Sequence, residues 1–167
     1  MKVKVILLAL ILATFGCRDI RDAELGEPFS KVEGLTATQW EIVEVEIVDG
    51  ADLAQTSRDF SQFFVDFPNK LTIDFEEDGT FVVLPGDGPN VFSSDNGVWE
   101  FDDVNVPTQI KLNPDADVQI LELEAPTRIV DQELKVKFDK YFCVLEEGEP
   151  EKPVYSYRLV FQRLNDE

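Results

Sequence analysis

Apolar and polar residues alternate with a period of two in several short segments between residues 40 and 163. In segment 70–75, for example, Leu71, Ile73 and Phe75 share one side and polar residues share the other. Clusters of Gly, Pro, Asn and Asp separate these segments, as is typical of antiparallel all-β domains. The pattern predicts eight strands, at 40–48, 70–75, 80–84, 97–101, 108–112, 118–123, 133–145 and 154–163.

The pattern also predicts local features of these strands. Segments 70–75 and 80–84 are joined by a turn containing Gly79, which can adopt the positive φ that a hairpin bulge requires. In the long segment 133–145 the alternation slips near Asp139 and Lys140. We therefore expect a hairpin at the first place and a β-bulge at the second.

One segment has the helical period instead, because four aromatic residues fall at i, i+3, i+4 and i+7: Phe60, Phe63, Phe64 and Phe67. Thr56 or Ser57 could cap its N-terminus, and Pro68 would stop it. We expect a short amphipathic helix that buries this stripe across the open end of a barrel. The alternative is a helix that dips into a membrane or grips a ligand.

Eight antiparallel strands with mostly short connections can close into a barrel or form two packed sheets. The fold class expected from the sequence is all-β: an eight-stranded antiparallel up-and-down barrel with one short helix. A two-sheet β-sandwich is the alternative. A barrel of this size has room for one small ligand or for its own side chains.

Residues 1–16 have the layout of a signal peptide, with Lys2 and Lys4 before the apolar run from Val5 to Ala13. This run is shorter than the roughly 20 residues that span a bilayer. The small Gly16 before Cys17 resembles the bacterial lipobox, although Thr14 and Phe15 stand where lipoboxes prefer leucine and a small residue. The resemblance implies that Cys17 is acylated and anchors the chain in a membrane. Ordinary secretion is the alternative.

The chain is strongly acidic, with 15 Lys and Arg against 34 Asp and Glu and a formal charge of -19. Phosphate backbones and anionic lipid surfaces would repel it, so we expect no nucleic-acid partner and no electrostatic membrane anchor. Segment 17–33 mixes charges with Gly and Pro without an apolar period and is expected to be a flexible tether. The β domain would then comprise residues 34–167.

The chain contains no histidine, which excludes Ser-His-Asp and Cys-His catalysis and histidine-based metal sites. Close carboxylate pairs are expected by chance among so many acids, so no catalytic pair is assigned. With Cys17 acylated, Cys143 has no disulfide partner and is expected to be a buried apolar residue. We therefore expect no enzymatic activity and no cofactor.

Four oxygen-bearing residues are spaced like positions 1, 3, 5 and 12 of an EF-hand loop: Asn113, Asp115, Asp117 and Glu124. Val118 stands at position 6, where that loop requires glycine, so we interpret the segment as a turn with solvated acids. No metal ligand is assigned. Weak calcium binding by the acidic loops 49–52 and 87–90 stays open.

Several residues resemble marks of the lipocalin-like bacterial lipoproteins of unknown function. Trp40 lies on the first strand, Arg163 ends the last one, and segments 78–81 and 97–99 are similar to a hairpin turn and a second tryptophan strand of that family. Thr38 replaces the glycine of the family's Gly-x-Trp motif. The resemblance covers about residues 34–164 and implies a lipocalin-type barrel whose base Trp40 and Arg163 close by a cation–π contact.

The resemblance also implies a location in the bacterial cell envelope, with a lipid anchor in the outer membrane and the domain on its periplasmic or surface side. One functional expectation is a small apolar ligand in the barrel, lined by Phe81, Val83, Trp99 and Phe101. The alternative is a filled core whose loops contact a protein or a glycan. The long loop 85–96, which carries Val91 and Phe92, could meet a ligand or fold back over the barrel mouth.

Overall fold

The computed structural model describes residues 30–49, 56–141 and 155–164. The expected leader with Cys17 and the expected buried residue Cys143 fall outside these ranges. Within the described residues there is no helix both long enough and apolar enough to cross a bilayer.

Two short helices and nine strands make up the described chain. The helices are α2 (Lys31–Thr36) and α3 (Gln62–Val65). The strands are β1 (Trp40–Asp49), β2 (Ser57–Asp59), β3 (Thr72–Phe75), β4 (Thr80–Leu84), β5 (Asn96–Phe101), β6 (Gln109–Leu112), β7 (Gln119–Leu123), β8 (Glu133–Lys140) and β9 (Tyr155–Arg163).

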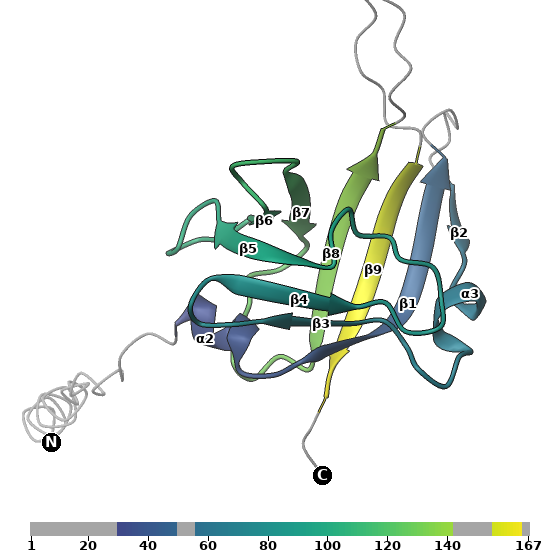
Figure 1. Cartoon of the computed structure of the whole chain (residues 1–167), viewed down its shortest axis with the longest axis horizontal. Helices are drawn as coiled ribbons and strands as arrows, with labels where there is room; N and C mark the ends of the chain where they lie inside the picture. Colours follow the sequence, from purple (N-terminus) through teal and green to yellow (C-terminus); the bar gives the residue numbers. More distant parts are fainter. Residues whose placement is uncertain (1–29, 50–55, 142–154, 165–167) are drawn as a thin grey trace, which may run out of the picture.

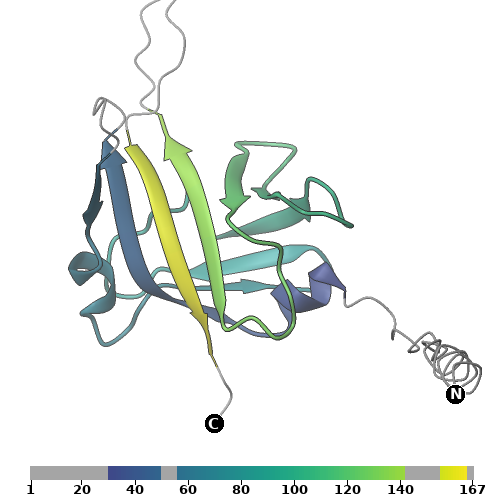
Figure 2. The same ribbon diagram turned by 180° about the vertical axis from the view of Figure 1, so that it is seen from behind.

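Eight of these strands close into an antiparallel up-and-down barrel. Each strand from β3 to β8 pairs with the strand that follows it in the sequence. Strand β1 pairs with both β3 and β9 and so closes the barrel. The long strands β1, β9 and β8 run side by side, and β3, β4 and β5 cross them at a steep angle (Figures 1 and 2). The predicted fold class is therefore confirmed, and the sandwich alternative is wrong because β1 hydrogen-bonds to strands on both sides.

The alternating residues face inward as the sequence pattern predicts. The core includes Ile73 and Phe75 of β3, Leu134 and Val136 of β8, and the predicted hairpin β3–β4 has regular register with Phe75 opposite Phe81. Gly79 has φ 85° in the turn of this hairpin, as expected for a position that favours glycine.

Among the described strand pairs the register shifts in β1, and no shift occurs at Asp139 or Lys140, where the sequence predicted a bulge. Pairing of β8 with β9 continues without a shift to Lys140, and residues 142–145 are outside the described ranges. In β1 the register shifts between Ile42 and Glu44. The start of β1 pairs with β3 and its end pairs with β2, so the strand has to bend between its two neighbours, and a bulge provides that bend.

The predicted aromatic helix is shorter than expected, and its stripe is not buried as a whole. Its expected N-terminal residues 57–59 form β2 against β1, and α3 has only four residues. Of the four aromatic residues only Phe64 is buried, whereas Phe63 and Phe67 are 50% and 37% exposed. The amide of Phe60 donates to the carbonyl of Val45. The backbone before α3 is therefore paired with β1 and does not form the first turn of a helix.

The helix α2 was not predicted, and residues 31–33 of the expected tether form its first turn. The Ser30 hydroxyl accepts a hydrogen bond from the Glu33 amide at 3.3 Å, which caps the helix. Leu35 is fully buried. The sequence pattern missed this element because a helix of six residues, less than two turns, is too short to show a period.

Candidate functional site

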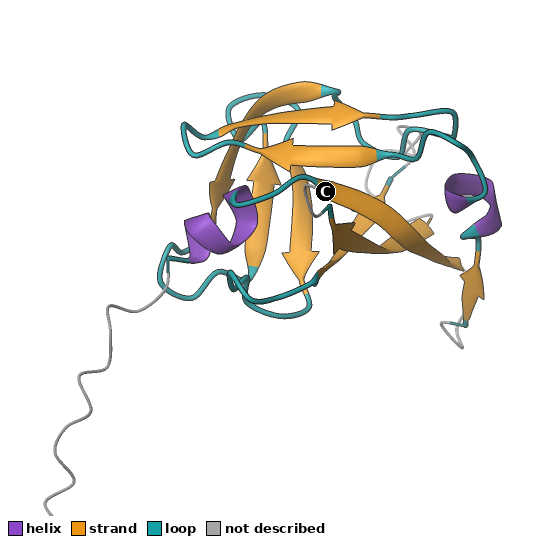
Figure 3. Ribbon diagram, turned by 90° about the horizontal axis from the view of Figure 1, so that it is seen from below, coloured by secondary structure: helices purple, strands orange, loops and turns teal. Residues whose placement is uncertain are grey.

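One end of the barrel is closed by α2. The indole Nε1 of Trp40 donates to the carbonyl of Leu35 at 2.8 Å, and the guanidinium of Arg163 lies 5.3 Å from the centroid of the Trp40 ring. Arg163 Nη2 also donates to the Gly34 carbonyl at 3.4 Å. Figure 3 views the barrel from this end, with α2 in front of the strands. Trp40 and Arg163 thus join the first strand, the last strand and α2.

The loop between β7 and β8 packs tightly on α2. The hydroxyl of Thr127 donates to the carbonyl of Lys31 at 2.8 Å. A Cβ atom at Gly34 would lie 2.9 Å from the backbone of Arg128, so only glycine allows this approach. These contacts make the closed end a structural feature.

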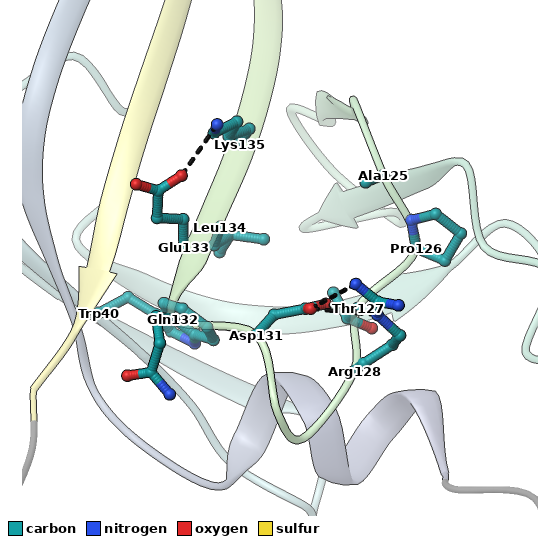
Figure 4. Close-up of a pocket in the computed structure, with 10 residues that line it drawn as sticks. All are labelled: Trp40, Ala125, Pro126, Thr127, Arg128, Asp131, Gln132, Glu133, Leu134 and Lys135. Carbon is teal, nitrogen blue, oxygen red and sulfur yellow. Dashed lines mark hydrogen bonds and ion pairs between the residues drawn. The ribbon is translucent and has the colours of Figure 1, made fainter.

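A cavity of about 330 Å³ lies beside this loop, and Figure 4 shows the ten residues that line it. Its charged groups already have partners, since Arg128 pairs with Asp131 at 2.8 Å and Lys135 pairs with Glu133 at 2.8 Å. Both pairs are surface contacts of small energetic value. This cavity offers a ligand few unpaired polar groups.

The barrel interior between β3 and β5 is packed. The four residues expected to line a ligand site are all buried: Phe81, Val83, Trp99 and Phe101. Trp99 makes edge contacts with Phe75 and Phe101 at centroid distances of 5.6 and 5.2 Å, and its Nε1 donates to the carbonyl of Glu76. None of the four lines the cavity beside the β7–β8 loop, the larger cavity between β7 and β8, or the cavity at the barrel end opposite α2. In this structure they pack against one another in the core.

The loop between β4 and β5 folds into the barrel. Val91 and Phe92 are buried, and the Phe92 ring lies 6.2 Å from that of Phe138 and 6.4 Å from that of Phe161. In Figure 1 this connection crosses in front of β8 and β9. Of the two expectations for this loop, the structure shows the one in which it covers the interior.

The barrel wall opens between β7 and β8. Only Glu122 and Leu123 pair with β8, opposite Lys137 and Val136, and the ladder ends with the Glu124 amide donating to the Lys135 carbonyl. Beyond these residues the two strands separate, as Figure 2 shows. All other strand pairs in β5–β9 have three or more paired residues.

Separation of the strands leaves backbone groups without ladder partners. Alternate residues of a strand direct their N–H and C=O groups to opposite neighbours. Since the Glu124 amide faces β8, the backbone groups of Ile120 face β8 as well, and by the same alternation those of Asp139 face β7. Neither residue is paired across this seam.

A cavity of about 740 Å³ fills the opening. Its lining is amphipathic: Val91, Ala116, Val118, Ile120, Phe138 and Tyr141 are apolar or aromatic, and Ser93, Gln109, Asp117, Gln119, Glu122, Asp139 and Lys140 are polar or charged. The side-chain carbonyl of Gln119 accepts from the amide and hydroxyl of Ser93 at 2.9 and 3.0 Å. This contact holds the β4–β5 loop against β7 at the edge of the cavity.

Of these lining residues, the sequence suggested only Val91, on the loop 85–96, as a ligand contact. The available signal was in β7, where Ile120 occupies the outward phase of the alternation and is nevertheless apolar and 42% exposed. Val118 just before β7 is likewise apolar and 47% exposed. A strand that is apolar on both faces without being buried on both faces indicates a contact surface.

Two of the four residues with EF-hand-like spacing, Asn113 and Glu124, make other contacts. Asn113 has φ 52°, its carbonyl accepts from the Ala116 amide, and its side chain accepts from the Val98 amide. Glu124 accepts from Arg158 at 2.6 and 3.0 Å, and this guanidinium holds the pKa of Glu124 below its usual value. Across the described ranges, no group of three or more Asp, Glu or Cys side chains is placed to hold a metal ion.

Comparison with protein-family models, curated proteins and solved structures gives no match to this chain.

Proposed function

We propose that this protein is a non-enzymatic, lipid-anchored protein of the bacterial cell envelope, with a lipocalin-like barrel that binds a small apolar ligand in the opening between β7 and β8. The cavity of about 740 Å³ in this opening carries the proposal. It lies within the range of roughly 300–1,000 Å³ that is typical of small-molecule sites. Its mixture of apolar side chains and a few polar groups is also typical of such sites.

The position of the apolar side chains supports an apolar ligand. Phe138 and Val91 form a buried floor, whereas Val118 and Ile120 are about half exposed at the wall. A ligand that covers these two side chains removes apolar surface from water. This burial stabilises the complex by about 25 cal/mol per Å² of apolar surface. The backbone groups of Ile120 and Asp139, which have no ladder partner across the β7–β8 seam, would orient its polar atoms.

A fluorescence titration of the purified full chain with N-phenyl-1-naphthylamine, a neutral apolar probe, tests the site. We expect saturable binding and a loss of affinity of at least about tenfold in Ile120→Lys, because the charge would be buried under the probe. The matched control is Val130→Lys, which changes a 66% exposed valine in the loop at the closed end. Equal loss in both variants, or none in Ile120→Lys, contradicts the proposal.

The lipid anchor has its own test. The leader 1–16 followed by Cys17 supports acylation. Metabolic labelling with a palmitate analogue should mark the wild-type chain and leave Cys17→Ser unlabelled. Label in Cys17→Ser would show that the anchor is not at this residue, and absence of label from both chains would favour ordinary secretion.

A second candidate function is docking of another envelope protein on the outer face of β4 and β5. Val82, Leu84 and Val98 are 42%, 54% and 48% exposed on that face. The packed core between β3 and β5 agrees with a scaffold role. A photo-crosslinker at position 98 that captures one defined envelope protein, in a chain that binds no apolar probe, would favour this function over ligand binding.

A further inference from the structure

A separate cavity of about 330 Å³ lies at the barrel end opposite α2. Six residues line it, from β1, β2, β9 and the start of the α3 turn: Ile47, Asp49, Arg58, Phe60, Tyr155 and Tyr157. Trp40 at the closed end and Ile47 here lie near opposite ends of β1, and Arg163 and Tyr157 are likewise separated along β9. The closed end at Trp40 and the cavity at Ile47 are thus separate parts of the fold.

Strand register places the charged group of this cavity on the inner face of the sheet. Arg58 is directly opposite Ile47, Ile47 is opposite Tyr157, and Tyr157 is opposite Phe138. Directly opposed residues of antiparallel strands project to the same face. Since Phe138 is a core residue, this row runs from the core across β9 and β1 to the guanidinium of Arg58.

Arg58 is unusual in this acidic chain because its guanidinium has no hydrogen-bond or ion-pair partner among the residues that the structure describes. The other arginines of the described ranges are engaged: Arg128 binds Asp131, Arg158 binds Glu46 and Glu124, and Arg163 contacts Trp40 and the Gly34 carbonyl. Acidic residues outnumber basic ones about two to one in this chain, so an arginine without a carboxylate partner is unexpected. Asp49, the one acid in this lining, makes an interaction of its own.

Aromatic rings form the rest of the wall. The Tyr157 ring stacks on Phe138 at 5.2 Å with an interplanar angle of 11°, and Phe60 contacts Phe63 at 5.7 Å. Burial raises the pKa of the Tyr157 hydroxyl, which therefore stays a neutral hydrogen-bond donor. The wall offers flat apolar surface, and the hydroxyls of Tyr155 and Tyr157 line it together with the cation of Arg58.

We propose that this cavity binds an amphipathic carboxylate, an aromatic or acyl acid whose carboxylate pairs with Arg58 while its apolar body lies against Phe60 and Tyr157. A guanidinium presents paired N–H donors that match the two oxygens of a carboxylate. Aromatic rings supply large apolar contact area for the body of the ligand. The site shares no lining residue with the opening between β7 and β8.

Isothermal titration calorimetry of the full chain with three naphthalene derivatives tests the proposal: 2-naphthoate, 2-naphthalenemethanol and 2-naphthylmethylamine. These share one ring system and differ in charge. We expect 2-naphthoate to bind about tenfold more tightly than the alcohol, as one charge-assisted hydrogen-bond pair would give. The cationic amine should bind most weakly.

Variants then assign the effect to Arg58. Arg58→Gln should abolish the tighter binding of 2-naphthoate relative to 2-naphthalenemethanol. Arg58→Lys should keep part of this difference in affinity. Phe60→Ala should weaken both ligands alike. Lys137→Gln is the matched control, since this lysine is exposed on β8 and also without a salt bridge in the described part of the chain.

The outcomes separate clearly. Equal affinity of acid and alcohol for the wild type, tighter binding of the amine, or undiminished 2-naphthoate binding by Arg58→Gln would each overturn the proposal. Loss of 2-naphthoate binding in Ile120→Lys with retention in Arg58→Gln would place this ligand in the opening between β7 and β8 instead.

Discussion

The two ends of the barrel use the same strands in opposite ways. At the end covered by α2, β1 and β9 are joined by Trp40, Arg163 and hydrogen bonds to helix carbonyls, and the loop after β7 packs at the distance only Gly34 permits. At the other end the strands extend past their neighbours, β7 leaves β8, and two cavities lie beside Phe138 and Tyr157. The difference indicates that stability is concentrated at one end and binding at the other.

A substitution at the closed end should have the largest effect on folding. Trp40→Ala removes a fully buried indole and its hydrogen bond to Leu35, and we expect it to lower the free energy of unfolding by about 3–5 kcal/mol. Urea unfolding measures this. Phe63→Ala, at a half-exposed ring near the other end, should cost less than about 1 kcal/mol. Similar losses in both variants would remove the distinction between the ends.

Gly34→Ala tests the close approach of the loop to α2. The added methyl group would meet the backbone of Arg128, so the loop has to move, and we expect a loss of about 1–3 kcal/mol. Gly97→Ala is an informative comparison because its Cβ would meet a side chain, that of Asn113, and not the backbone. A fully stable Gly34→Ala protein would show that the contact is loose.

Arg163→Met should have a smaller effect. The cation–π contact with Trp40 is worth about 0.5–2 kcal/mol in general. Part of this is offset because the Nε atom of Arg163 is buried and finds no acceptor within the described ranges, and methionine removes that group while keeping apolar contact with the indole. We expect a net loss of about 1 kcal/mol or less in urea unfolding, and a loss as large as that of Trp40→Ala would be inconsistent with this balance.

The smallest expected effect concerns pH and the residue where the β7–β8 ladder ends. Arg158 lowers the pKa of Glu124 and also contacts Glu46 on β1 at 3.1 Å. Since the pKa is lower in the folded state, this contribution to stability is complete above the unfolded pKa of Glu124 and declines as pH falls through the folded value.

Unfolding of wild type and Glu124→Gln at neutral pH and near pH 3 measures this contribution. The difference in unfolding free energy between the two chains should be present at neutral pH and should shrink at the acidic pH. Glu77→Gln, an exposed position in the β3–β4 turn, serves as the control and should show little difference at either pH. A Glu124→Gln difference that grows on acidification would contradict the assigned sign.

Much of the fold could be predicted from alternation because each strand has one wet face. The β3–β4 hairpin, in which Phe75 lies opposite Phe81, follows from this alternation. The contact of Arg163 with Trp40 was instead expected from the resemblance to lipocalin-like lipoproteins. The elements that the pattern did not predict correctly are short, since α2, β2 and α3 have too few residues to show a period. Tertiary hydrogen bonds, such as that from the Phe60 amide to the Val45 carbonyl, determine their structure instead.

The candidate sites were harder to predict for a different reason. A cavity depends on where two strands stop pairing, and nothing in segments 118–123 and 133–140 specifies that only Glu122 and Leu123 pair with β8. Arg58 was assigned no role because it lay within an expected helix, and its position opposite Ile47 exists only once β2 forms. The aromatic lining of both cavities comes from four separate strands and loops.

Amide hydrogen exchange of the full chain, with and without N-phenyl-1-naphthylamine, tests the division between the two ends most directly. The account predicts rapid exchange at Ile120 and Asp139 in the free chain, slower exchange at both when the probe is bound, and slow, unchanged exchange at Trp40 and Phe161. Protection of Ile120 and Asp139 in the free chain, or a probe effect confined to the α2 end, would contradict it.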